Sequence, residues 1–127
     1  MAGQRSDVPN ILRSADCMIA ASRHEGFGLA VAEAMASGLP TVAAGVGALP
    51  ELIVNGDSGI LVDAPDATHI AGAVSNLLAD SGLRERVGAA AQKRIDEKFS
   101  LQRMLTAHED LYLALARSKG LDSTAPE

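Results

Sequence analysis

Three short apolar runs divide the first half of the chain. They cover residues 16–21, 41–44 and 58–62, and polar residues, glycine or proline bound them. Short runs that are apolar on both faces are typical of strands buried between two layers of helices, as in parallel sheets. We therefore expect three strands, the first of them buried on both faces.

Helical patterns fill the intervals between these runs and the second half of the chain. Residues 28–37 are apolar or glycine apart from Glu33 and the final serine, which predicts a deeply buried helix that ends at Gly38. Asp66 and Ser100 are expected to be N-caps. The other predicted helices cover residues 8–15, 51–54, 67–78, 82–98 and 101–118.

Strands that alternate with helices imply parallel pairing and right-handed crossovers. The expected fold class is α/β, a partial Rossmann-like domain with about three parallel strands, flanking helices and two C-terminal helices. Residues 1–118 are assigned to this domain and residues 119–127 to a flexible tail. Because three strands leave the sheet edges unprotected, we expect further strands upstream of this sequence, and self-association through the exposed edge.

Composition narrows the possible classes. The chain has 127 residues, of which 47% are hydrophobic and 21% charged, as in soluble globular proteins. Aromatic residues make up only 2%, so the core must consist of Ala, Val, Leu, Ile and Met. The net charge is −5 and no cluster of Lys and Arg could follow a phosphate backbone, which argues against nucleic-acid binding.

The sequence gives further expectations about compartment and cysteine chemistry. Cys17 is the single cysteine, so an intramolecular disulfide and a multi-cysteine metal site are excluded, and we expect a buried thiol. Neither a signal peptide nor an apolar run of membrane-spanning length is apparent, and a cytoplasmic location is expected. The charged runs at residues 84–86 and 94–98 are predicted to be solvated helix faces.

The loop at residues 22–28 carries the candidate chemistry. It follows the first predicted strand, and open α/β sheets bind ligands beyond the carboxyl ends of their strands. Its glycines permit close backbone approach, and the helix that begins near Gly28 would point unpaired amides at an anion such as a diphosphate. His24 is expected to be an exposed loop residue.

Glu25 and Glu33 are the candidate ligand-binding side chains. They are expected to flank the anion site from opposite sides, and a carboxylate can accept two hydrogen bonds from a sugar or ribose diol. Each also has a simpler interpretation, because Glu25 would favour a helix N-terminus and Glu33 could be an ordinary solvated helix residue. The apolar neighbours of Glu33 argue against the second of these, since an acid within such a helix needs a polar partner.

Residues 25–43 resemble the E-x7-E signature of the family 4 retaining glycosyltransferases. The resemblance extends from about Gly3 to Leu115 and includes the segments at residues 6–9, 14–16, 50–51, 55–56, 59–62 and 94–112. It departs from the family pattern at Ala21, where the family usually has proline, and at Ala48, where it has a second glycine. The arginines at positions 13 and 23 do not match the basic residues with which the family neutralises the diphosphate.

The resemblance implies roles for individual residues. Glu25 would contact hydroxyls of the donor hexose and act electrostatically in catalysis, and Glu33 would contact the ribose. The backbone amides that would face the sugar and diphosphate are those of Gly26, Phe27, Gly28 and Leu29. The fold would be the C-terminal domain of the GT-B type, and the hexose would be transferred with retention, without a metal or other cofactor.

The resulting hypothesis is that this chain is the donor-binding portion of a hexosyltransferase of cell-envelope polysaccharide biosynthesis. Its donor would be a UDP-, GDP- or ADP-linked sugar and its acceptor a glycan, a lipid or another molecule. An N-terminal domain or partner chain would complete it, and any peripheral membrane association would come through that domain. The alternative is a non-catalytic remnant, or a donor-binding or assembly subunit without turnover of its own.

Overall fold

A computed structural model describes residues 3–63 and 66–120 of the chain. The chain divides into two compact units, Met1–Asp96 and Glu97–Glu127. The predicted tail lies outside the described residues from position 121 onward, and the assignment of residues 1–118 to one domain stays a prediction.

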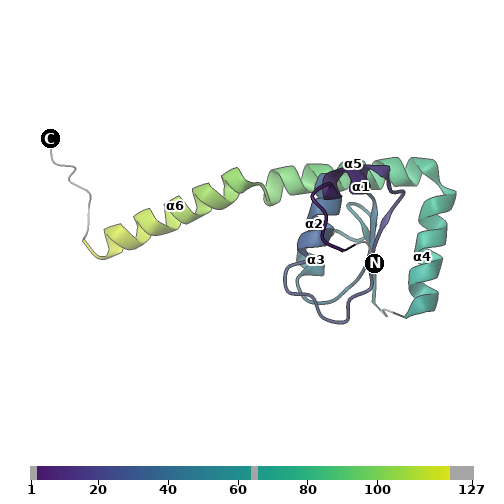
Figure 1. The fold of residues 1–127 in the computed structure, drawn as a ribbon. Coiled ribbons are helices and arrows are strands. Elements are labelled where there is room, and N and C mark those ends of the chain that lie inside the picture. Colours follow the sequence, from purple (N-terminus) through teal and green to yellow (C-terminus); the bar gives the residue numbers. More distant parts are fainter. Residues whose placement is uncertain (1–2, 64–65, 121–127) are drawn as a thin grey trace. The chain divides into compact units, whose positions relative to one another are not determined.

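A three-stranded parallel sheet forms the centre of the first unit (Figure 1). Its strands are β1 (Met18–Ala20), β2 (Thr41–Ala44) and β3 (Ile60–Val62), and β2 pairs with both of the others. All residues of β2 are buried, because this strand is covered by neighbours on both edges and by helices on both faces. The expectation of three parallel strands is confirmed.

Helices cover both faces of this sheet. α2 (Leu29–Ala36) packs on β1 and β2, whereas α4 (Ala67–Ala79) packs on β2 and β3. In Figure 1, α2 and α3 (Leu49–Leu52) lie on one side of the sheet and α4 on the other. Right-handed crossovers explain this layering, since strands laid down in the order β1, β2, β3 place both crossover helices on the same face. The first unit also contains α1 (Val8–Ser14) and most of α5 (Ser81–Lys98).

The face of the sheet under α4 contains a small aliphatic core. Its fully buried members include Val42 and Leu77, and Cys17 packs against them half-buried. Desolvation is the main cause that raises the pKa of the Cys17 thiol. The expected burial of this residue is only partial, and the desolvation it does undergo disfavours the thiolate form.

β1 is more exposed than the sequence predicts. Ile19 is 47% exposed, although a strand buried on both faces was expected. The reason is that β1 is an edge strand. α4 packs mainly on β2 and β3 and leaves Ile19 of β1 largely uncovered.

α2 is buried on one side only, which corrects the expectation of a deeply buried helix. Val31, Ala34 and Met35 face the core, and each is at most 2% exposed. The opposite side, which we call the exposed face of α2, consists of Leu29, Ala30, Glu33 and Ala36. Glu33 therefore needs no polar partner within the protein, because water reaches it.

Two arginines from the charged runs are not simply solvated. The guanidinium of Arg84 donates to the carbonyls of Leu77 and Leu78 at the end of α4. Arg94 of α5 donates to the carbonyls of Glu51 and Leu52, both at 2.7 Å. A cation at a helix C-terminus satisfies carbonyls that lack intrahelical partners and complements the helix dipole. The expectation of solvated helix faces is wrong for these two side chains.

Most predicted helix boundaries agree with the structure to within one or two residues. The Asp66 side chain accepts hydrogen bonds from the amides of Thr68 and His69, and these bonds together with the His69 ring lower the pKa of Asp66. α3 begins two residues earlier than predicted, at Leu49. Pro50 belongs to its first turn, where the fixed φ of proline is helical and no amide is needed.

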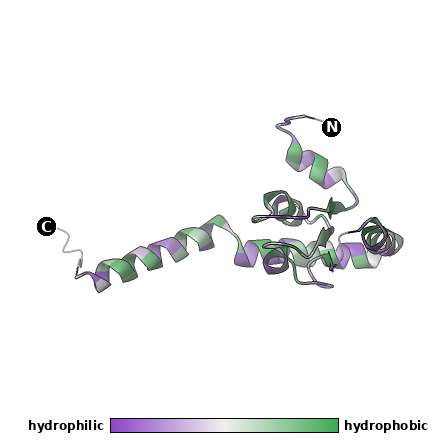
Figure 2. Ribbon diagram, turned by 90° about the horizontal axis from the view of Figure 1, so that it is seen from below, coloured by the Kyte–Doolittle hydropathy of each residue, from purple (hydrophilic) through white to green (hydrophobic). Residues whose placement is uncertain are grey.

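The second unit contains one long helix, α6 (Leu101–Ser118), with Ser100 as its N-cap. Its large apolar residues are exposed, and apolar positions are spread along its whole length (Figure 2). Those at positions 101, 104, 105, 111, 112 and 115 share one side of the helix by their spacing, whereas Leu113 does not. None of the helices in the described residues is long and apolar enough to cross a membrane.

The contact of α5 with the turn after α2 can be tested with two glycines in helix interiors. A β-carbon at Gly88 would overlap the carbonyl oxygen of Gly38, whereas a β-carbon at Gly72 meets no atom within 4 Å. We expect Gly88→Ala to lower the free energy of unfolding by about 1–3 kcal/mol, the cost of overpacking. Gly72→Ala should raise it by up to about 1 kcal/mol through helix propensity. Urea denaturation followed by circular dichroism measures both free energies of unfolding. Equal changes in the two variants would contradict a tight contact between Gly88 and Gly38.

The exposed edge of the sheet predicts self-association. Size-exclusion chromatography with light scattering should find the chain larger than a monomer, and Ile19→Lys should shift it toward the monomer, because an edge lysine opposes strand pairing. Leu78→Lys is a matched control, since Leu78 is 44% exposed, close to the 47% of Ile19, but lies on α4. A monomeric wild-type chain would refute the expectation.

Candidate functional site

The loop between β1 and α2 lies at the carboxyl edge of the sheet, as expected. It ends at Gly28, which has φ of 86°, a left-handed conformation that side chains rarely adopt. Gly28 is also the N-cap of α2, and no side chain caps this helix start. The first hydrogen bond of the helix runs from the Ala32 amide to the Gly28 carbonyl, so the amides of the first turn, at residues 29–31, have no partner within the helix.

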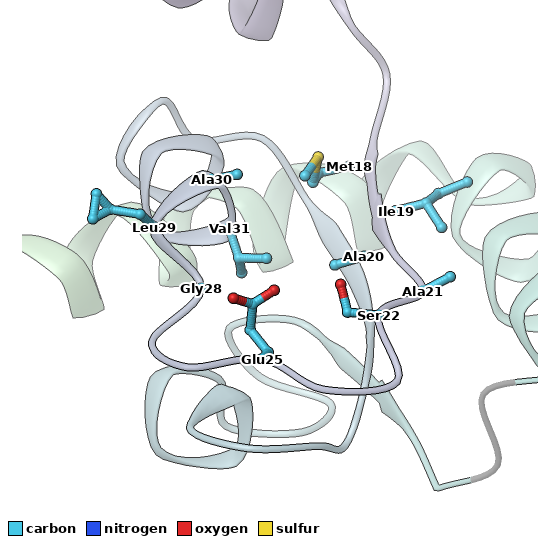
Figure 3. Close-up of a pocket in the computed structure, with 10 residues that line it drawn as sticks. All are labelled: Met18, Ile19, Ala20, Ala21, Ser22, Glu25, Gly28, Leu29, Ala30 and Val31. Carbon is cyan, nitrogen blue, oxygen red and sulfur yellow. The ribbon is translucent and has the colours of Figure 1, made fainter.

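A cavity of about 500 Å³ opens between this loop, β1 and the start of α2 (Figure 3). The Glu25 carboxylate and the Ser22 hydroxyl point into it, whereas the side chains of Ile19 and Leu29 point away. Its lining consists of Met18, Ile19, Ala20, Ala21, Ser22, Glu25, Gly28, Leu29, Ala30 and Val31.

Glu25 is the polar group best placed to bind a ligand in this cavity. Its side chain is half-buried, and none of the groups in residues 3–63 and 66–120 donates a hydrogen bond to its carboxylate. A partly desolvated carboxylate without a protein donor gains most from hydroxyl donors of a ligand. A vicinal diol supplies two such donors.

The remaining predicted loop residues contribute mainly backbone. Gly26 is exposed and a β-carbon there would meet no atom within 4 Å. Phe27 is 48% exposed and Leu29 60% exposed, so neither side chain is part of the core. His24 is exposed, as expected.

Glu33 lies in a different hollow. This second hollow, of about 340 Å³, lies between α1 and α2 and is lined by Val8, Pro9, Leu12, Glu33, Ala36 and Ser37. The spacing in the sequence suggested that Glu25 and Glu33 flank one site from opposite sides. The structure instead places them in two separate hollows. Both hollows reach the exposed face of α2, because Ala30 of the first cavity is one helical turn before Glu33.

Neither hollow is lined by a lysine or an arginine. The start of α2 lines the first cavity together with Glu25, but a helix N-terminus is equivalent to only about half an elementary positive charge. Within the described residues, no group of three or more His, Cys, Asp and Glu side chains is arranged to hold a metal ion.

Sequence reasoning missed two contributors to this site. Ser22 points its hydroxyl into the cavity, and Gly47, from the loop after β2, touches the backbone of Glu25. A signal for the second was present in the pair Gly45 and Gly47, because glycines after a parallel strand often mark close backbone approach.

Fold and cavity together define a Rossmann-like α/β domain with a cavity at the carboxyl edge of the sheet, the place where open α/β sheets bind ligands. The sequence then identifies the family: residues 1–94 match the profile "Glycosyl transferases group 1". The chain belongs to this glycosyltransferase family.

Comparison with individual proteins supports the same assignment. The N-acetyl-alpha-D-glucosaminyl L-malate synthase of Bacillus anthracis is 34% identical over 115 residues, which are 91% of this chain. The chain spans only 30% of the length of that relative.

Two solved structures show the fold. Sucrose-phosphate synthase from Thermosynechococcus elongatus matches with a TM-score of 0.79 and 30% identity, over 85% of this chain and 27% of that protein. Anabaena Alr3699/HepE in complex with UDP matches with a TM-score of 0.78 and 25% identity, over 89% of this chain and 30% of that protein. The expected fold, the C-terminal domain of a GT-B glycosyltransferase, is confirmed.

Proposed function

We propose that this chain is the donor-binding part of a retaining hexosyltransferase of family 4. The observation that carries the proposal is the half-buried Glu25 carboxylate, which faces an open cavity at the start of α2 and has no hydrogen-bond donor in the described protein. A nucleotide sugar has the complementary groups, since its hexose carries hydroxyl donors and its diphosphate is an anion for the helix start.

The two hollows suggest how the donor would lie. The hexose would occupy the first cavity with its hydroxyls on Glu25, and the diphosphate would meet the amides from Gly26 to Leu29. The nucleoside would extend along the exposed face of α2 to Glu33, whose carboxylate would accept hydrogen bonds from the ribose hydroxyls. The apolar side chains of α1 in the second hollow offer a surface for the remainder of the nucleoside.

In this proposal Glu25 acts by binding and by electrostatic stabilisation rather than as a nucleophile. A fixed carboxylate beside the hexose would favour the positive charge that develops on the sugar as the diphosphate leaves. The transfer would use no bound metal or other cofactor. A cytoplasmic location is part of the same proposal.

UDP is the nucleotide with the most direct support, because Anabaena Alr3699/HepE was solved with UDP. The acceptor is not assigned. The names of the Bacillus anthracis relative and the Thermosynechococcus elongatus neighbour imply different acceptors, which suggests that the shared part does not select them. We expect binding without turnover by this chain alone, since no lysine or arginine lines either hollow.

Ligand-detected NMR with UDP-, GDP- and ADP-hexoses and the free nucleotides tests the proposal through two variants. Glu33→Ala should lower the affinity for the nucleotide hexose and for the free nucleotide alike, by about tenfold, which corresponds to the loss of one charge-assisted hydrogen bond. Glu25→Ala should lower the affinity for the nucleotide hexose only, because the free nucleotide has no hexose for Glu25 to contact.

Glu85→Ala is the control, since Glu85 is an exposed glutamate of α5 outside both hollows. It should bind as the wild type does. Failure of the wild-type chain to bind any of the donors would contradict the proposal and favour a remnant without donor-binding function.

A further inference from the structure

The loop that carries Glu25 has little hydrogen-bonded support of its own. Among the described residues, positions 22–26 make no backbone hydrogen bond, and their side chains make none to other groups. The direction in which Glu25 enters the cavity must therefore be fixed by packing of this loop against its surroundings.

The closest packing partner is the loop after β2, at residues 45–48. A β-carbon at Gly47 would overlap the carbonyl oxygen of Glu25, and it would lie 2.9 Å from the carbonyl carbon and 3.4 Å from the Cα of the same residue. All three atoms belong to the backbone of Glu25. Gly47 also has φ of 57°, so both space and conformation require glycine at this position.

A second contact joins the loop that carries Glu25 to Leu49, the first residue of α3. A β-carbon at Gly28 would lie 2.6 Å from Leu49 Cδ2 and 3.6 Å from Glu25 Cγ. Leu49 is fully buried, so a β-carbon at Gly28 would require this side chain to shift within the core. The absence of side chains at Gly28 and Gly47 thus lets the loop that carries Glu25 pack closely against the loop after β2 and the start of α3.

The loop after β2 is in turn firmly fixed. The Gly45 amide donates to the Val62 carbonyl of β3 at 2.9 Å, and the Leu49 amide donates to the Val46 carbonyl at 3.2 Å. α3, which continues from this loop, is held at its C-terminus by Arg94 of α5. The loop after β2 therefore acts as a rigid support, and the loop that carries Glu25 rests on it.

We propose that Gly47 is a positioning residue for donor recognition: the absence of a side chain at this position sets where the Glu25 carboxylate stands in the cavity. The inference rests on the proposed function for its ligand, but the contact itself can be tested without one. Gly47 touches no part of the donor in this arrangement, so its effect on binding passes through the backbone of Glu25.

The test uses Gly47→Ala and Gly47→Asn with two glycine controls. Asparagine tolerates the left-handed conformation better than alanine, but it still introduces the β-carbon. Gly45→Ala is the control for the loop, because its β-carbon would lie 3.6 Å from the nearest atom, an ordinary contact. Gly56→Ala is the control for conformation, because Gly56 has φ of 79° but meets no atom within 4 Å.

The first measurement needs no ligand. In ¹H–¹⁵N spectra of the free chain, both Gly47 variants should shift the amide signals of residues 25–28, whereas Gly45→Ala and Gly56→Ala should leave these signals in place. If the Gly47 variants leave them in place as well, the contact does not position Glu25. Loss of the folded state in both Gly47 variants but in neither control would also overturn the proposal, because Gly47 would then support the fold as a whole.

The second measurement compares affinities for UDP-glucose and UDP. The Gly47 variants should lower the affinity for UDP-glucose by about tenfold relative to UDP, as expected for one lost charge-assisted hydrogen bond. A parallel loss for both ligands would contradict a role through Glu25. If the Gly47 variants shift the amide signals but the wild-type chain binds neither UDP-glucose nor UDP, the result refutes the use of UDP-linked donors and still confirms that Gly47 positions Glu25.

Discussion

Direct contact between backbone segments, with no side chain between them, is the constraint on which this domain depends. α5 meets the turn after α2 at Gly88, where the Gly38 carbonyl leaves no room for a β-carbon, and the loops after β1 and β2 meet at Gly47 in the same way. A chain with 2% aromatic residues has few large side chains with which to fill wider gaps. Close approach is how it reaches the packing density of a protein interior.

The elements of the fold could be predicted because their signals are local. The run around β2 is apolar on both faces and follows Pro40, and Asp66 and Ser100 stand where N-caps are needed. Exposure could not be predicted in the same way. Ile19 looks like a core residue in sequence, and only its place at the sheet edge shows that little covers it. The same holds for Arg94, whose carbonyl partners on α3 are more than 40 positions away in sequence.

The candidate site was predictable to a similar extent. Glu25 and the glycines around it stand after a strand and before a helix, and this context alone indicates a ligand loop. The separation of Glu25 and Glu33 into two hollows was not predictable, because it depends on which side of α2 packs on the sheet and on the position of α1. Gly47 was missed for the same kind of reason, since a glycine in a turn does not reveal which backbone it touches.

The electrostatics of the site explain why this domain would need more than its own residues to hold a diphosphate. The chain has a net charge of −5, Glu25 and Glu33 add negative charge where the donor would lie, and the start of α2 offsets only about half a charge. Two carboxylates would accept hydrogen bonds from the hexose and ribose hydroxyls, but they would repel the phosphates that join these two sugars. In the proposed function, the residues of the two hollows would therefore contact mainly the neutral ends of a nucleotide sugar. Positive groups from outside the two hollows would have to hold its centre, because neither hollow is lined by a lysine or an arginine.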